Sequence, residues 1–271
     1  MMLQGSRTVR WPALGILCAL LAAPAMPAAA EDLPVDLELV LAVDVSGSMD
    51  LDEQRLQRAG YLQAITHGEV MNAILSGPLQ RIALAYVEWA GPRSQSVVVP
   101  WQLIDGPDAA GRFVDQLSEA PLGRTRYTSI SAALQFAAAQ FEGNGFAGDR
   151  QIVDISGDGP NNSGTPVPPV RDDIADRGIV VNGLPIMIKS SQLPTVTGFD
   201  LDVYYEDCVI AGAGAFVVPV LDMADFARAI RQKMALEIAA RELRPTLVAA
   251  RQPRVDCGIG EKMRGSWYRD P

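Results

Sequence analysis

The sequence is poor in the residues from which many metal and catalytic sites are built. Its 271 residues include one histidine, His67, and three cysteines. A structural zinc site needs about four nitrogen or sulfur ligands, which these few, widely spaced residues do not supply. Neither a G-x-S-x-G elbow nor a phosphate-binding P-loop occurs. We interpret His67 as a surface or helix-break residue, because a catalytic base must lie within reach of the chemistry.

Basic residues and long apolar runs are also scarce. The chain has 23 Lys and Arg against 32 Asp and Glu, for a net charge of −9. This balance argues against nucleic acid as a partner, because phosphate binding needs clustered basic side chains. The apolar stretch at residues 13–23 lies between Pro12 and Pro24 and is too short to span a bilayer.

The N-terminus has the pattern of a secretory signal peptide. Arg7 and Arg10 precede the apolar stretch, and three alanines, Ala28 to Ala30, follow it. We therefore predict a signal peptide at residues 1–30 and an exported protein, periplasmic or secreted, without a membrane anchor. A retained anchor is the alternative. Cleavage would remove two arginines and no acid, so the net charge would become −11.

Export would also remove Cys18 and leave Cys208 and Cys257. In an oxidising compartment, two remaining cysteines favour one disulfide, with two free thiols as the alternative. The predicted bond would tie a C-terminal tail, residues 241–271, back onto a single domain at residues 31–240.

Strand and helix patterns alternate along that domain, which predicts an α/β fold. "DLELVLAVD" (36–44) and "QIVDISGDG" (151–159) are apolar enough to be inner strands covered on both faces. The alternation predicts a doubly wound, mostly parallel sheet with helices on both faces and one antiparallel edge strand. Further elements are expected as follows: a helix over 51–75 broken at Gly68, a hairpin over 81–104, a helix opened by Thr128, strands over 179–187 and 215–220, and a closing helix over 223–240.

The stretch "DVSGSMD" places oxygen-bearing side chains directly after the first of these strands. Asp44, Ser46 and Ser48 alternate around Gly47, at the strand end where ligands bind in a doubly wound sheet. Their oxygens could converge on one cation. The alternative is a helix cap, in which Ser48 or Asp50 accepts hydrogen bonds from the next helix.

With Thr128 opening a later helix and Asp158 ending a central strand, the chain resembles the von Willebrand factor type A family, the fold of integrin inserted domains. More narrowly, "DVSGSMD", "ALAYVEWA" and "DISGDGPNN" resemble a group of exported bacterial proteins with this fold. The family carries a metal-ion-dependent adhesion site (MIDAS) with the signature Asp-x-Ser-x-Ser, a later Thr, and an Asp at a central strand's end. The resemblance thus implies a metal site at Asp44, Ser46, Ser48, Thr128 and Asp158.

Three positions depart from the family pattern or compete with it. Gly157 stands where the family usually has Thr. Asp154 competes with Asp158 for the ion, and we prefer Asp158 because it lies at the strand's end. Thr125 competes with Thr128, and we prefer Thr128 because "TSISAAL" begins an apolar-faced helix.

The resemblance implies metal-bridged protein recognition. Hydroxyl and carboxylate oxygens suit Mg²⁺, or alternatively Mn²⁺ or Ca²⁺. In the family the ion accepts a carboxylate from a partner protein. Two alternatives are a metal-dependent hydrolase and a structural protein whose cation only stabilises the sheet's rim.

Overall fold

The computed structural model describes residues 31–123, 125–188, 200–239 and 252–267. The predicted signal peptide lies outside these residues, as does much of the predicted tail. In the described part of the chain, no helix is both long and apolar enough to cross a membrane.

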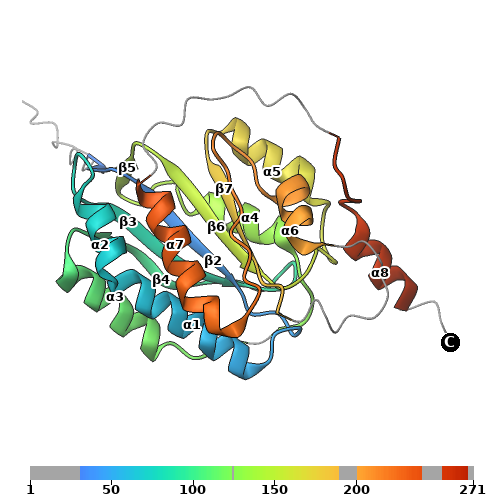
Figure 1. Ribbon diagram of the computed structural model, residues 1–271. Coiled ribbons are helices and arrows are strands. Elements are labelled where there is room, and N and C mark those ends of the chain that lie inside the picture. The colour runs from blue at the N-terminus through green and yellow to red at the C-terminus, as the bar shows by residue number, and fades with distance from the viewer. Residues whose placement is uncertain (1–30, 124, 189–199, 240–251, 268–271) are drawn as a thin grey trace, which may run out of the picture. The chain divides into compact units, whose positions relative to one another are not determined.

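The fold is built on a five-stranded sheet with the strand order β4-β3-β2-β6-β7 (Figure 1). The four parallel strands are β2 (Glu38–Asp44), β3 (Ile82–Trp89), β6 (Gln151–Gly157) and β7 (Val180–Pro185). The edge strand β4 (Gln95–Ile104) runs antiparallel to β3. The predicted fold class is confirmed, including the hairpin and the inner pair β2 and β6.

Helices cover both faces of the sheet because β2 is apolar on both of its sides. Leu39 and Leu41 point into one core with Tyr61 and Phe226, whereas Val40 packs in the other. The first face carries α1 (Leu51–Thr66), α2 (Gly68–Leu75), α3 (Pro107–Glu119) and α7 (Phe226–Ala239). The second carries α4 (Ile130–Ala139), α5 (Val167–Asp176), α6 (Leu201–Tyr204) and the π-helix η1 (Tyr205–Val209). Smaller elements are β1 (Leu33–Val35) paired with β5 (Phe146–Gly148), the 3-10 helix η2 (Met223–Asp225) and α8 (Ile259–Trp267).

Two element predictions need correction. The predicted strand over 215–220 forms only isolated bridges to β7 and its continuation, at Val217 and Val220. Pro219 between them has no N–H for a continuous ladder. The helix predicted to open at Thr128 begins at Ile130 instead, because the Ser129 side chain accepts from the Ala132 N–H and is the N-cap.

The predicted break near Gly68 is confirmed. The His67 side chain accepts a hydrogen bond from the Glu69 N–H and caps α2, which begins at Gly68. His67 is therefore an exposed helix-break residue, as the sequence indicated.

A charged cluster is buried between α7 and the strands β6 and β7. The Lys233 Nζ lies 2.6 Å from Asp154 Oδ1 and 2.5 Å from Glu237 Oε1, and all three side chains are at most 1% exposed. The Asn182 amide donates to the same Glu237 oxygen at 3.0 Å. Mutual pairing is what makes buried charges tolerable in a core.

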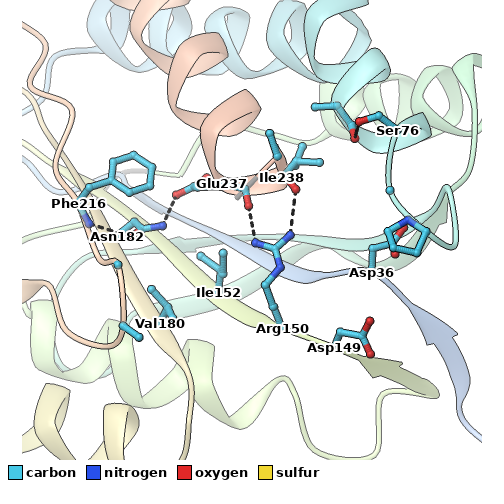
Figure 2. Close-up of a pocket in the computed structure, with 16 residues that line it drawn as sticks. Asp36, Ser76, Asp149, Arg150, Ile152, Val180, Asn182, Phe216, Glu237 and Ile238 are labelled. Atoms are coloured by element: carbon cyan, nitrogen blue, oxygen red, sulfur yellow. Dashed lines mark hydrogen bonds between the residues drawn. The ribbon is translucent and has the colours of Figure 1, made fainter. Parts of the chain in front are cut away.

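Glu237 and Asn182 line a cavity of about 790 Å³ (Figure 2). Arg150 borders it and donates to the carbonyl oxygens of Glu237 and Ile238 at 2.7 and 2.9 Å. The cavity lies where β6 and β7 begin, at Ile152 and Val180, so it is at the opposite end of the sheet from Asp44.

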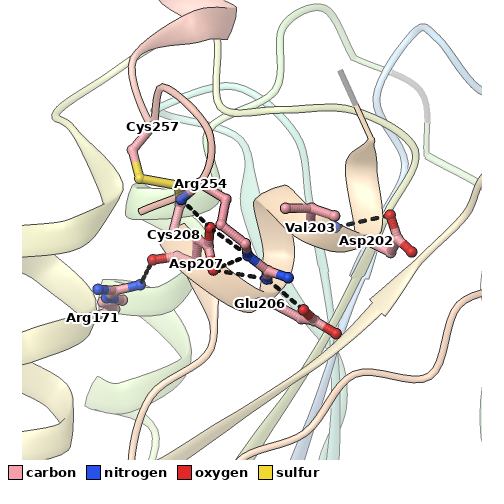
Figure 3. A network of polar contacts seen from close by, with 8 residues as sticks. All are labelled: Arg171, Asp202, Val203, Glu206, Asp207, Cys208, Arg254 and Cys257. Carbon is pink, nitrogen blue, oxygen red and sulfur yellow. Dashed lines mark hydrogen bonds and ion pairs between the residues drawn. A yellow bond between two sulfur atoms is a disulfide. The ribbon is translucent and has the colours of Figure 1, made fainter. Parts of the chain in front are cut away.

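The C-terminal segment is held to η1 by covalent and ionic contacts (Figure 3). A disulfide joins Cys208 to Cys257, with a Cα–Cα distance of 5.5 Å. Next to it, Arg254 pairs with Glu206 at 2.5 Å and with Asp207 at 2.8 Å. The disulfide predicted from the cysteine count is thus present in the structure.

Candidate functional site

Asp44, Ser46, Ser48 and Asp158 form a chain of hydrogen bonds at the carboxyl end of the sheet. The Ser46 N–H donates to Asp44 Oδ1 at 2.7 Å, which folds the chain back after β2. The Ser46 and Ser48 hydroxyls are 2.9 Å apart, and the Ser48 hydroxyl donates to Asp158 Oδ1 at 2.6 Å. Two parallel neighbouring strands end here, so residues 110 positions apart meet at one rim.

Helix capping and site formation are carried out by different residues of the same stretch. Asp50 accepts from the backbone N–H groups of Asp52 and Glu53, and the Glu53 side chain accepts from the Asp50 N–H. This capping box begins α1. The cap alternative therefore describes Asp50, whereas Ser48 is bonded to Asp158.

Asp44 is a buried carboxylate at the carboxyl end of the sheet. Its side chain is fully buried, and its Oδ2 has no hydrogen-bond partner among the described residues. Burial, and then the nearby Asp158 carboxylate, raise the pKa of Asp44 well above its usual value, and hydrogen bonding by Ser46 and by the backbone of Asp158 offsets part of this rise. A buried carboxylate beside a second carboxylate and two hydroxyls is a set of oxygen donors that suits a hard divalent cation.

Among the described residues, neither candidate threonine makes a side-chain hydrogen bond to Asp44, Ser46, Ser48 or Asp158. The Thr128 N–H donates to Asn162 Oδ1 at 3.0 Å, and the Thr128 carbonyl accepts from the Asn162 N–H at 2.9 Å. Thr125 pairs with Ser46 through a backbone bridge, and its N–H donates to the Val45 carbonyl at 3.3 Å. The segment 125–128 therefore borders the loop after β2, and the assignment of Thr128 to the metal stays a prediction.

Asp154 does not reach the rim. It lies inside β6, and its carboxylate faces Lys233 in the buried cluster described above. Asp158 is thus the carboxylate of this region that lies with the serines. No group of three or more His, Cys, Asp or Glu side chains that could hold a metal occurs in the described ranges, so a cation here would depend on hydroxyls.

The helix α8 packs against the loop that follows Asp158. The Glu261 carboxylate accepts from the Asn161 side chain at 2.7 Å, and Arg264 donates to the Asn162 carbonyl at 3.2 Å. The Arg264 guanidinium also lies over the ring of Tyr127, 4.6 Å from its centroid. The C-terminal segment therefore takes part in shaping the face beside the candidate site.

Sequence reasoning missed Tyr205, whose hydroxyl lies behind the rim. A Cβ added to Gly157 would lie 2.8 Å from this hydroxyl and 3.0 Å from Asp44 Oδ2. Gly157, which stands where the family usually has Thr, was the feature of the sequence that pointed to this contact, because a side chain at this position would collide with the Tyr205 hydroxyl.

The family described as "Protein of unknown function (DUF1194)" matches residues 34–242. No curated protein matches the chain.

Several solved structures have a similar fold. Proximal thread matrix protein 1 from the mussel byssus has 14% identity and a TM-score of 0.56, over 78% of this chain and 49% of that one. Another structure of that protein has a zinc-occupied MIDAS motif, with 13% identity and a TM-score of 0.52 over the same shares of the two chains. The pilus adhesin SpaC from Lactobacillus rhamnosus GG has 14% identity and a TM-score of 0.53, over 77% of this chain and 31% of that one.

A von Willebrand factor type A structure from Catenulispora acidiphila has 17% identity and a TM-score of 0.49, over 75% of this chain and 43% of that one. The chain thus spans less than half of each of these proteins. At such identities the likeness is one of fold.

Proposed function

The chain belongs to the family described as "Protein of unknown function (DUF1194)", and we propose that it binds a divalent cation at the rim and uses it to recognise a partner protein. The ion would be held by Asp44, Ser46, Ser48, Thr128 and Asp158. Mg²⁺ is the preferred ion, with Mn²⁺ and Ca²⁺ as alternatives, because the donors are hydroxyl and carboxylate oxygens.

One observation carries the proposal: the hydrogen-bonded chain from Asp44 through Ser46 and Ser48 to Asp158. It brings both carboxylates and both serine hydroxyls of the motif to one place. Ser48 could instead have capped α1, but Asp50 does so. The zinc-occupied MIDAS of the mussel protein supports a divalent ion in a chain of similar fold.

The mode of recognition follows from the low negative charge of the five proposed metal ligands. Three neutral hydroxyls and two carboxylates leave a bound ion electrophilic and with open positions for oxygen ligands. A carboxylate of a partner protein is the ligand that such an ion favours. The residues of this chain would fix the ion's place, while the partner would supply the added negative charge.

Recognition is favoured over catalysis by the contacts of the side chains. The ring of His67, the one histidine of the sequence, accepts a hydrogen bond from the Glu69 N–H and caps α2, so it is not arranged as a base for the serine hydroxyls at the rim. A byssus matrix protein and a pilus adhesin among proteins of similar fold are consistent with an adhesive role. We also propose export to the periplasm or outside the cell, with residues 1–30 as signal peptide and 31–240 as the domain.

Affinity capture tests this function. The protein and its Asp44→Ala variant would serve as baits in periplasmic extract, with Mg²⁺ or with a chelator. We expect a partner that is retained by the unaltered protein in Mg²⁺ and lost in chelator and with Asp44→Ala. A partner retained equally in all conditions would contradict metal-bridged recognition. Mg²⁺ binding without any Mg²⁺-dependent partner would favour a cation that only stabilises the rim.

A further inference from the structure

Three residues behind the proposed metal site each have a buried polar atom that makes no hydrogen bond within the described part of the chain. Asp44 Oδ2, the Tyr205 hydroxyl and Trp89 Nε1 are all buried and have no hydrogen-bond partner within the part of the chain that the structure describes. Such atoms are rare in folded proteins because each costs free energy, so a group of them calls for an explanation.

The three residues meet at Gly157, the last residue of β6. A Cβ built on Gly157 would lie 2.8 Å from the Tyr205 hydroxyl, 3.0 Å from Asp44 Oδ2 and 3.3 Å from Trp89 Cζ2. The donor of Tyr205 and the acceptor of Asp44 therefore lie within 3.0 Å of the same point. Glycine at this position leaves the space between them free of a side chain.

Tyr205 is held in place from several sides. It begins the π-helix η1, an element that often occurs at functional sites. The disulfide of Cys208 fixes the same turn to Cys257. The Tyr205 ring also lies against Gly183 in β7, where an added Cβ would be 2.6 Å from Cδ1. Two glycines on neighbouring strands thus make room for this one side chain.

We propose that Tyr205 is a positioning residue of the metal site, whose hydroxyl donates to Oδ2 of Asp44 when a cation is bound. This inference rests on the proposed function. The donor would orient the carboxylate and compensate its burial, while leaving the hydroxyls of Ser46 and Ser48 to face the ion. Tyr205 itself would not contact the metal.

Calorimetric titration with Mg²⁺ tests the inference. For Tyr205→Phe, we expect a dissociation constant about 10- to 100-fold higher than that of the unaltered protein, the usual effect of losing an outer-shell partner of a metal ligand. The melting temperature without Mg²⁺ should change little, because the deleted hydroxyl has no hydrogen-bond partner among the described residues. Tyr86→Phe is the matched control, since Tyr86 is equally buried but packs in the core on the other face of the sheet.

Equal Mg²⁺ affinity of Tyr205→Phe and the unaltered protein would overturn the role of the hydroxyl while leaving the proposed function standing. Failure of the unaltered protein to bind Mg²⁺ would instead contradict the proposed function itself.

Discussion

Gly260 of α8 packs directly on the backbone of Asn161, in the loop that follows Asp158. A Cβ at position 260 would collide with the Asn161 carbonyl oxygen. This contact, together with the bond from Asn161 to Glu261, brings the C-terminal helix against the face beside the candidate metal site. A residue of the C-terminal helix thus takes part in forming the surface beside the loop that follows β6.

Gly260→Ala is expected to disturb the docking of α8, because backbone atoms on the facing loop cannot move aside as a flexible side chain would. Hydrogen exchange measured on peptides from residues 252–267 should become faster than in the unaltered protein. Gly258→Ala is the control, since its Cβ would meet only Asp256 Oδ1 at an ordinary 3.5 Å. Identical exchange in both variants would show that α8 does not depend on this close contact.

The disulfide between Cys208 and Cys257 should contribute strongly to stability. It closes a loop with a sequence separation of 49, for which loop entropy predicts about 4 kcal/mol. We expect the double variant Cys208→Ala, Cys257→Ala to lose up to about this free energy of unfolding in denaturant titrations. Mass spectrometry should find neither cysteine alkylated in denaturant without reductant, and alkylation of both would contradict the bond.

Glu237 should make stability depend on pH. Burial, followed by the Asp154 carboxylate, raises the pKa of Glu237 to about 8 from 4.5, although Lys233 and Asn182 oppose this rise. Between these values the folded state holds a proton that the unfolded state has released. The free energy of unfolding should therefore fall as pH rises from about 4.5 to about 8, by at most about 1.4 kcal/mol per pH unit from this group.

Denaturant titrations across that pH range check the prediction. Glu237→Gln should show a shallower decline than the unaltered protein, because its side chain does not titrate. Glu69→Gln is the control, since Glu69 is an exposed glutamate paired with Arg231 at 3.1 Å. Parallel stability curves for Glu237→Gln and the unaltered protein would contradict the raised pKa.

The sequence predicted the frame of the fold because that frame depends on local patterns. The apolar runs that became β2 and β6 are buried on both faces, and such strands lie inside a parallel sheet. Their carboxyl ends meet at one edge, so the sequence alone indicated that Asp44 and Asp158 lie together.

What the sequence did not predict depends on contacts between distant segments. The position of Tyr205 follows from space left by Gly157 and Gly183 on two strands, and no local pattern around Tyr205 indicates it. The packing of α8 likewise depends on one glycine fitting a distant loop. The start of α4 was misplaced because Thr128 and Ser129 are both good capping residues, and only the geometry distinguishes them.

The most direct test of the account is the Mg²⁺ affinity of the Asp44→Ala variant, measured by calorimetry. Asp50→Asn is the matched control, because it removes a carboxylate from the same stretch while asparagine still caps α1. We expect the unaltered protein and Asp50→Asn to bind Mg²⁺ equally, and Asp44→Ala to remain folded without measurable binding. Unchanged Mg²⁺ affinity in Asp44→Ala would contradict a cation site at this rim.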